Sequence, residues 1–151
     1  MIDFINRNLV HVNQESFVTA IYAVYDPAGR KIRIARAAHP RPIFFRPAVG
    51  KARELVCEGV SPMGVDLYER VPTTEISLQP GDRLLFYTDG VTERFNPKEE
   101  TYDEERLCRM MESPQIEDPK PLLDRIVQDL TEFAEGHPAD DDQAMLLAIL
   151  D

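Results

Sequence analysis

Two acidic segments of this 151-residue chain each lie beside an apolar segment. Residues 89–93 follow the apolar run 83–88, and residues 140–143 precede the apolar run 144–150. Apolar runs of this length are typical of β-strands, which place the neighbouring acids on stiff backbone. Hard divalent cations prefer carboxylate oxygen as a ligand. The spacing of these residues therefore predicts a metal site at the ends of two strands.

The strands that would position these acids follow an N-terminal helix. The apolar residues of 2–13 recur at helical spacing and predict an amphipathic helix. Asp-Pro-Ala-Gly at 26–29 predicts a hairpin turn, and Gln-Pro-Gly-Asp at 79–82 predicts a second hairpin. Residues 59–70 contain two glycines and a proline and indicate a loop. The predicted strands are 17–25, 31–37, 43–45, 55–56, 74–78, 83–88 and 144–150.

Two helices are expected before the last strand. Thr101 and Glu104 have the spacing of a capping box, which predicts a helix over 102–112. Asp118 predicts the start of a longer helix, which Gly136 ends.

The last predicted strand, 144–150, is almost wholly apolar, as expected of a central strand covered on both faces. The order of helix, antiparallel strands, two helices and a closing strand predicts a layered α+β architecture. At 151 residues the chain fits a single domain.

Composition limits the classes of function. With 17 basic and 27 acidic residues, the formal net charge is -10 at pH 7, which disfavours nucleic acid and anionic membranes and suits a cation or a basic partner. The two cysteines, Cys57 and Cys108, are far apart and favour a reducing compartment. The sequence has no signal-peptide pattern and no run near the roughly 18 apolar residues of a membrane span. We therefore expect a cytoplasmic protein.

Six motifs occur in one order along nearly the whole chain, at 17–22, 37–42, 61–65, 81–93, 102–107 and 141–144. The most informative is Gly-Asp-Arg-Leu-Leu-Phe-Tyr-Thr-Asp-Gly-Val-Thr-Glu at 81–93, followed by Asp-Asp-Gln-Ala at 141–144. Together they resemble the SpoIIE/RsbU-type bacterial serine phosphatases. One such motif alone is a weak pattern, whereas six in order are specific.

The resemblance implies a fold and an activity. The fold would be the α/β/β/α sandwich of the protein phosphatase 2C superfamily, with two antiparallel sheets flanked by helices. Two Mg²⁺ or Mn²⁺ ions would hold a water that attacks a phosphoserine or phosphothreonine in line. The expected substrate is a phosphorylated regulatory protein, commonly a STAS-type anti-anti-sigma factor that regulates a sigma factor.

Four residues take roles by their match to the family motifs. Asp89 matches the metal ligand of the Thr-Asp-Gly motif, and Asp141 matches the first acid of the Asp-Asp pair. Gly90 would let the backbone turn tightly beside the ion. Asp142 would orient the site without binding the ion directly. We expect the Asp89 and Asp141 side chains to converge on one cation.

The chain also departs from the family pattern. The Gly-Asp strand and the Asp-Gly turn that supply a bridging aspartate and a carbonyl ligand do not occur before Phe17, so we expect the C-terminal two thirds of the family domain. Two carboxylates alone would hold a hydrated Mg²⁺ weakly, so we expect weak activity or none. Ala38 and Ala144 stand where the family usually has glycine and threonine.

Three alternatives stay open on the sequence alone. The Asp-Gly pair and the aspartates at 140–142 could be an ordinary turn and a solvated loop. The chain could be a non-catalytic interaction module that binds a signalling partner. An exposed sheet edge could also pair in a homodimer.

Overall fold

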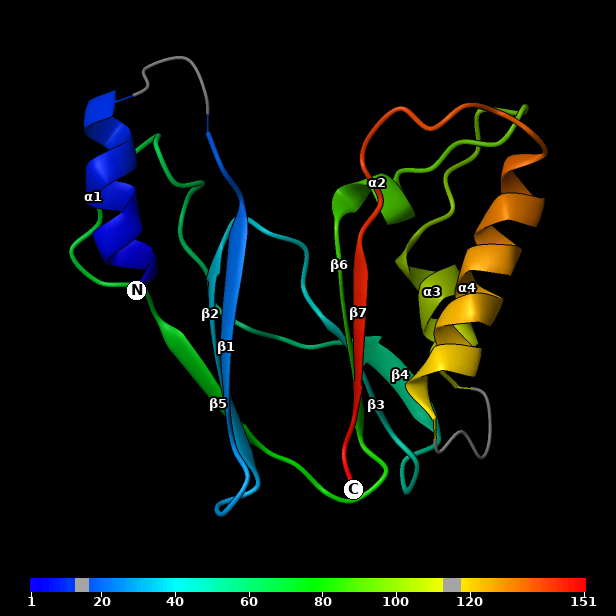
Figure 1. Ribbon diagram of the computed structural model, residues 1–151, viewed down its shortest axis with the longest axis horizontal. Helices are drawn as coiled ribbons and strands as arrows, with labels where there is room; N and C mark the ends of the chain where they lie inside the picture. Colours follow the sequence, from blue (N-terminus) through cyan, green and yellow to red (C-terminus); the bar gives the residue numbers. More distant parts are fainter. Residues whose placement is uncertain (13–16, 113–117) are drawn as a thin grey trace. The chain divides into compact units, whose positions relative to one another are not determined.

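The computed structural model describes residues 1–12, 17–112 and 118–151, which form two compact units (Figure 1). Unit 1 comprises Met1–His39 and Val56–Leu78, and unit 2 comprises Pro40–Leu55 and Gln79–Asp151. Each unit contains one antiparallel sheet with helix beside it. The predicted α+β class with two antiparallel sheets is therefore confirmed.

Unit 1 contains the predicted N-terminal helix and first hairpin. Its sheet has the strand order β1-β2-β5, and β1 pairs with β2 from Ala20↔Ala37 to Asp26↔Lys31. Residue 13, the predicted end of the helix, lies outside the described residues. The elements of unit 1 are α1 (Ile2–Val12), β1 (Ala20–Asp26), β2 (Lys31–Ala37) and β5 (Thr73–Ser77).

A buried asparagine attaches α1 to the loop that precedes β5. The Asn6 side chain is fully buried, and its Nδ2 donates to the carbonyl of Asp66 at 2.8 Å. Its Oδ1 accepts a bond of 2.8 Å from the backbone N–H of Gly64. Nearby, Ile2 and Met63 pack in one apolar cluster. The helix is thus held by side-chain packing and by satisfied polar contacts.

Ala38 adopts a backbone conformation that favours glycine. Its φ is +51°, and its N–H donates to the carbonyl of Val60 at 2.9 Å, which holds this conformation in place. A Cβ in the left-handed region costs roughly 1–2 kcal/mol. The family pattern has glycine at this position, and the φ value supplies the physical reason.

Ala38→Gly is therefore expected to raise the free energy of unfolding by about 0.5–1 kcal/mol, after allowing for the greater freedom of glycine in the unfolded chain. Thermal melting followed by circular dichroism measures the change. Ala28→Gly is the matched control, because Ala28 is an exposed turn residue outside the positive-φ region, and this change should not stabilise the chain. A melting temperature of Ala38→Gly at or below that of the Ala28→Gly variant would contradict the prediction.

Unit 2 contains the second sheet and three helices. The strand order is β4-β3-β6-β7, all antiparallel. The elements are β3 (Ile43–Arg46), β4 (Lys51–Glu54), β6 (Arg83–Tyr87), α2 (Asp89–Thr92), α3 (Glu104–Met111), α4 (Pro119–Ala134) and β7 (Met145–Ile149).

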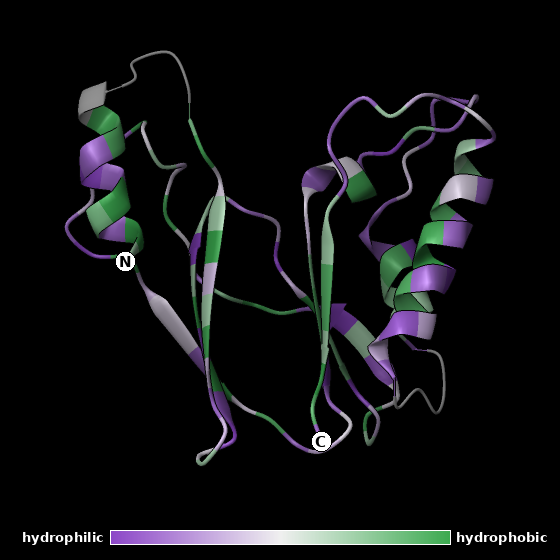
Figure 2. Ribbon diagram, in the orientation of Figure 1, coloured by the Kyte–Doolittle hydropathy of each residue, from purple (hydrophilic) through white to green (hydrophobic). Residues whose placement is uncertain are grey.

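The core of unit 2 lies between one face of this sheet and the helices α3 and α4. Alternating residues of β3, β6 and β7 point to the same face as the apolar sides of the two helices. Figure 2 shows hydrophobic and hydrophilic residues alternating along α4 at helical spacing. The buried members of this cluster are Ile43, Phe45, Leu85, Tyr87, Val91, Tyr102, Leu107, Met111, Leu122, Ile126, Leu130 and Leu147.

Three strand predictions are wrong. The segments predicted as a second hairpin belong to different sheets, because β5 pairs with β2 whereas β6 pairs with β3 and β7. The fourth strand is Lys51–Glu54 and not 55–56, since the chain turns at 47–50 and pairs at once with β3. The last strand is not central, because β7 has β6 as its one neighbour among the described strands, and Leu146 is 60% exposed.

The helix ends agree in part with the sequence. Asp118 caps α4 through a bond of 2.9 Å from Lys120 N, and Gly136 follows its end with φ +84°, as predicted. The capping box at Thr101 is wrong, because Asp103 caps α3 by accepting from Arg106 N at 2.8 Å.

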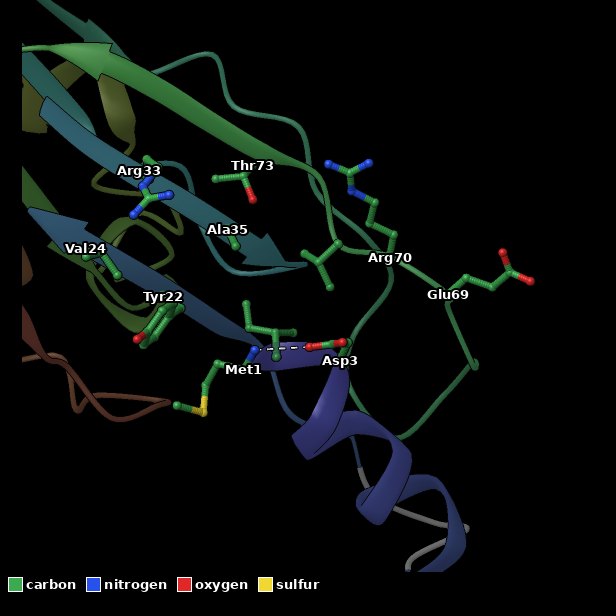
Figure 3. A pocket seen from close by; sticks show the side chains of 11 residues that line it. Met1, Asp3, Tyr22, Val24, Arg33, Ala35, Glu69, Arg70 and Thr73 are labelled. Carbon is green, nitrogen blue, oxygen red and sulfur yellow. Dashed lines mark hydrogen bonds and ion pairs between the residues drawn. The ribbon is translucent and has the colours of Figure 1, made fainter.

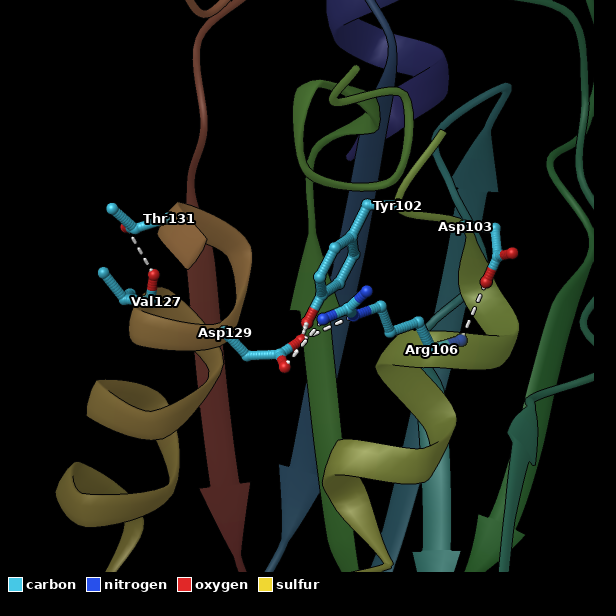
Figure 4. Close-up of polar contacts among 6 residues, drawn as sticks. All are labelled: Tyr102, Asp103, Arg106, Val127, Asp129 and Thr131. Carbon is cyan, nitrogen blue, oxygen red and sulfur yellow. Dashed lines mark hydrogen bonds and ion pairs between the residues drawn. The ribbon is translucent and has the colours of Figure 1, made fainter. Parts of the chain in front are cut away.

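A polar cluster joins α3 to α4 (Figure 4). Asp129 accepts bonds of 2.8 and 2.9 Å from the Arg106 guanidinium and a bond of 2.7 Å from the Tyr102 hydroxyl. The guanidinium also lies over the rings of Tyr102 and Phe133, at 5.1 and 4.8 Å from their centroids. The bonds from Arg106 hold the pKa of the Asp129 carboxyl below its ordinary value. With these donors and acceptors paired, the cluster is structural.

Candidate metal centre

The pairing of β6 with β7 brings the two acidic segments together where β6 ends and β7 begins. The two strands are antiparallel, and Tyr87, the last residue of β6, lies opposite Met145, the first residue of β7. Residues that follow β6 and residues that precede β7 are therefore neighbours. We call residues 88–93 the first acidic turn and residues 140–144 the second acidic turn.

Four hydrogen bonds connect these two turns. The backbone N–H of Thr88 donates to the carbonyl of Ala144 at 3.1 Å. The Thr88 hydroxyl donates to the carbonyl of Asp142 at 2.9 Å and accepts from the N–H of Ala144 at 3.0 Å. The Gln143 side-chain amide donates to the carbonyl of Gly90 at 2.9 Å. The predicted proximity of the two acidic turns is thus present in the backbone.

Gly90 lies at the closest approach of the two turns. A Cβ at this position would be 2.6 Å from the carbonyl oxygen of Asp142 and 3.2 Å from that of Asp141. Both obstacles are backbone atoms, so they cannot rotate away. Glycine is required here because the second turn occupies the space of a side chain.

Each predicted ligand uses one carboxylate oxygen to hold its own turn. Asp89 Oδ1 accepts from the N–H of Gly90 at 3.1 Å, and Asp141 Oδ1 accepts from the N–H of Asp142 at 2.7 Å. Across the described ranges, neither carboxylate has an ion-pair partner or a bond at its second oxygen. Asp89 is partly buried and Asp141 is exposed. The second oxygens are therefore available to a cation.

The donor set fits a hard, hydrated cation at a sparse site. The described residues contain no group of three or more His, Cys, Asp or Glu side chains that could hold a metal ion. Mg²⁺ keeps several waters and is commonly bound through one or two carboxylates. Asp89 and Asp141 match that requirement, whereas a zinc site typically has three or four protein ligands that include nitrogen or sulfur.

Asp142 takes part in the site through its backbone. Its carbonyl accepts the bond from Thr88, and its N–H donates to Asp141. Its predicted role in orienting the metal site through its side chain stays a prediction.

Arg94 holds the chain that leads into the second acidic turn. Its guanidinium donates to the backbone carbonyls of His137 and Pro138. No sequence pattern singled out this residue or the contacts of Thr88 and Gln143. An arginine directly after the first acidic turn was the one available signal, since side-chain bonds to distant carbonyls leave no periodic pattern.

Other features of the chain do not add ligands to this site. A cavity of about 340 Å³ in unit 1 lies between the start of α1 and the strands β1 and β2, and its lining includes Tyr22, Val24, Asp3 and Arg70 (Figure 3). None of the predicted ligands lines it.

Neither His39 nor the cysteines show features of a reactive group. Nδ1 of the partly buried His39 lies 3.1 Å from the Thr19 hydroxyl, as expected of a hydrogen-bonded loop histidine. Cys57 is buried. Burial raises the pKa of the Cys108 thiol to about 11, which keeps it protonated near neutral pH.

The sequence matches a family known for this arrangement of motifs. The profile of the family described as Stage II sporulation protein E (SpoIIE) matches residues 1–150. The chain belongs to the SpoIIE family. This SpoIIE-family chain is also 26% identical over 136 residues to Protein IcfG of Synechocystis sp. (strain ATCC 27184 / PCC 6803 / Kazusa), a match that covers 90% of the chain and 21% of IcfG.

Solved structures show the same fold. The SiaA-PP2C domain of Pseudomonas aeruginosa is similar, with a TM-score of 0.83 and 18% identity. The match covers 99% of the SpoIIE-family chain and 58% of the SiaA-PP2C chain. The phosphatase domain of SpoIIE from Bacillus subtilis has a TM-score of 0.71 and 16% identity, over 99% and 65%. The RsbU and RsbW domains of Rv1364c from Mycobacterium tuberculosis have a TM-score of 0.68 and 23% identity. That match covers 95% of the SpoIIE-family chain and 39% of the Rv1364c chain.

The fold is therefore that of PP2C-like phosphatase domains, and the family supports a phosphatase function. The SpoIIE-family chain spans about a fifth of the length of IcfG and less than two thirds of the SiaA-PP2C chain. No helix within the described ranges combines the length and apolar character that a bilayer crossing requires.

Proposed function

We propose that this chain contains part of the metal site of a metal-dependent phosphatase that hydrolyses phosphoserine or phosphothreonine in a regulatory protein. The observation that carries the proposal is the close approach of the two acidic turns at Gly90, beside Asp89 and Asp141. These two carboxylates would bind Mg²⁺ or Mn²⁺ through their second oxygens. One of the solved relatives was presoaked with Mn, which supports the choice of ion.

The residues of the chain would act by binding and orienting. When bound, a divalent cation lowers the pKa of a bound water and screens the oxygens of a phosphoryl group. Asp89, on the half-buried start of α2, supplies one negative charge at a fixed position, and the exposed Asp141 supplies the second. The exposed second turn leaves room for a protein substrate. We infer that the substrate is a phosphorylated STAS-type anti-anti-sigma factor in the cytoplasm. One solved relative contains RsbU and RsbW domains, which agrees with the RsbU-type motifs of this chain.

Removal and return of the metal tests this function. We expect no release of phosphate from p-nitrophenyl phosphate or a phosphoserine peptide in EDTA, and slow release after addition of Mn²⁺. Binding should be weak, with a Kd on the order of 10⁻⁴–10⁻³ M, because the described site has two carboxylates. Calorimetry measures the binding, and a phosphate assay measures turnover. Turnover at the same rate in EDTA would exclude the metal-dependent mechanism.

A second candidate is a non-catalytic interaction module within a signalling protein. The small number of predicted ligands among the described residues favours it. A calorimetric titration that gives no heat with Mn²⁺ would support this module.

A homodimer through a sheet edge stays a prediction. In the described sheets β1 and β7 each have one strand neighbour, so each has an edge that could pair with a second copy, and light scattering tests it.

A further inference from the structure

The Thr88 hydroxyl bonds to the second acidic turn and not to the helix that it precedes. Thr88 occupies the N-cap position of α2, where a threonine hydroxyl usually accepts a bond from the backbone of its own helix. No such capping bond forms. Its hydroxyl instead bonds the carbonyl of Asp142 and the N–H of Ala144, at 2.9 and 3.0 Å. One side chain thus fixes two peptide groups across the gap between the turns.

Gln143 makes the reciprocal contact. It is exposed, so water could satisfy its amide, yet its Nε2 donates to the carbonyl of Gly90 at 2.9 Å. Gly90 directly follows Asp89, and Gln143 lies two residues after Asp141. Each of these two side chains therefore bonds the backbone beside the aspartate of the opposite turn.

We propose that Thr88 and Gln143, which we call the turn clamp, are positioning residues that set the affinity of Asp89 and Asp141 for a divalent cation. The inference rests on the proposed function and extends it to residues that bind no metal themselves. It follows from the sparse ligand set, because two carboxylates on separate segments bind one ion more tightly when their relative position is fixed beforehand.

The physical effect of the turn clamp is on the fraction of molecules that are ready to bind. The second acidic turn is exposed from Asp140 to Ala144, and α2 has only four residues. Without the cross-turn bonds these segments would sample other conformations, and the ion would have to order them. The apparent Kd rises in inverse proportion to the fraction of molecules that are competent to bind.

Matched substitutions test the turn clamp in the full chain. Thr88→Val removes the hydroxyl at constant shape, Thr88→Ser keeps it, and Gln143→Met removes the amide. Thr131→Val and Gln128→Met are the controls, since their side chains donate to Val127 and Glu132 within α4 (Figure 4 shows the Thr131 bond). The readouts are Mn²⁺ affinity by calorimetry and hydrogen exchange of the amides of residues 141–144 without metal.

We expect Thr88→Val to weaken Mn²⁺ binding roughly tenfold, at the lower end of what outer-shell partners contribute. Gln143→Met should weaken it roughly threefold, since this side chain makes one exposed bond where Thr88 makes two. Both variants should show faster amide exchange in the second acidic turn. Thr88→Ser should restore affinity to within about twofold of wild type, and both controls should bind as wild type. Because Gln143 is exposed, Gln143→Met should fold as the wild type does, so it still tests the turn clamp if Thr88→Val folds poorly.

The outcomes separate the turn clamp from the proposed function. Wild-type affinity in both Thr88→Val and Gln143→Met, with binding abolished in Asp89→Asn, overturns the turn clamp and leaves the metal site in place. Absence of Mn²⁺ binding by the wild-type chain overturns the proposed function and the metal role of the turn clamp together. Unchanged amide exchange in Thr88→Val overturns the structural basis of the inference directly.

Discussion

Asp82→Ala is expected to lower the free energy of unfolding by about 3–5 kcal/mol, because it removes the buried carboxylate to which the Arg46 guanidinium and the Gln79 N–H donate. The Asp82 side chain is completely buried and the Arg46 side chain is 25% exposed. Arg46 Nη2 donates to Asp82 Oδ2 at 2.6 Å, and Arg46 Nε donates to Oδ1 at 2.9 Å. The N–H of Gln79 donates to the same carboxylate at 2.8 Å. Urea denaturation followed by circular dichroism measures the change.

Two further variants separate this cause from general sensitivity of the fold. Asp124→Ala removes an ion pair with Lys120 on the surface of α4, where the side chains are 64% and 76% exposed, and should change stability little. The double variant Arg46→Met, Asp82→Leu replaces both members of the ion pair by apolar groups and should be more stable than Asp82→Ala, since both charges are removed together. Equal losses in the single and double variants would argue against the broken ion pair as the cause.

Asp82 also shows why one prediction from the sequence failed. Gln-Pro-Gly-Asp at 79–82 has the composition of a hairpin turn, and the flanking segments have strand periodicity. Local patterns identify strands but not their partners, and here the carboxylate of Asp82 bonds Arg46, 36 residues earlier in the chain. That long-range contact holds the start of β6 beside β3, and β6 pairs with β3 and β7.

Elements with strong local signals were predicted well. The helix α1, the hairpin of β1 and β2, and the capped start of α4 at Asp118 depend on periodicity and turn chemistry within a few residues. The position of β7 at the edge of its sheet was not predictable from its apolar composition. A strand at the edge of a sheet can still bury one face, so an apolar sequence does not show whether the strand is central.

The sequence pattern selected the acids of the candidate site, whose role as ligands stays a prediction, but it did not select the residues that support them. The approach of the two acidic turns follows from the antiparallel pairing of β6 and β7, and Gly90 was selected for a tight turn. The structure gives Gly90 a different reason, the 2.6 Å approach to the carbonyl of Asp142. The bonds of Thr88, Gln143 and Arg94 to backbone carbonyls depend on three-dimensional proximity, which no spacing rule records.

Asp89→Asn and Asp141→Asn are each expected to lower Mn²⁺-dependent kcat/KM at least about 100-fold, the upper range for loss of a mere supporting contact. Asparagine keeps Oδ1, so the bonds from the N–H groups of Gly90 and Asp142 at 3.1 and 2.7 Å can persist and the turns can keep their shape. What each change removes is the negative charge that the second oxygen offers to the cation. Calorimetry should show that the heat of Mn²⁺ binding disappears in both variants.

Asp140→Asn is the matched control for this pair. Asp140 is exposed in the second acidic turn, as is Asp141, so the substitution removes one negative charge from the same neighbourhood. If net charge alone attracted the ion, all three variants would weaken binding similarly, and the weakening would vanish at high salt. Direct ligation predicts instead that Asp140→Asn binds as wild type at any salt concentration. Robust Mn²⁺-dependent turnover in Asp89→Asn would refute the role of Asp89 as a ligand, whatever the effect at Asp141.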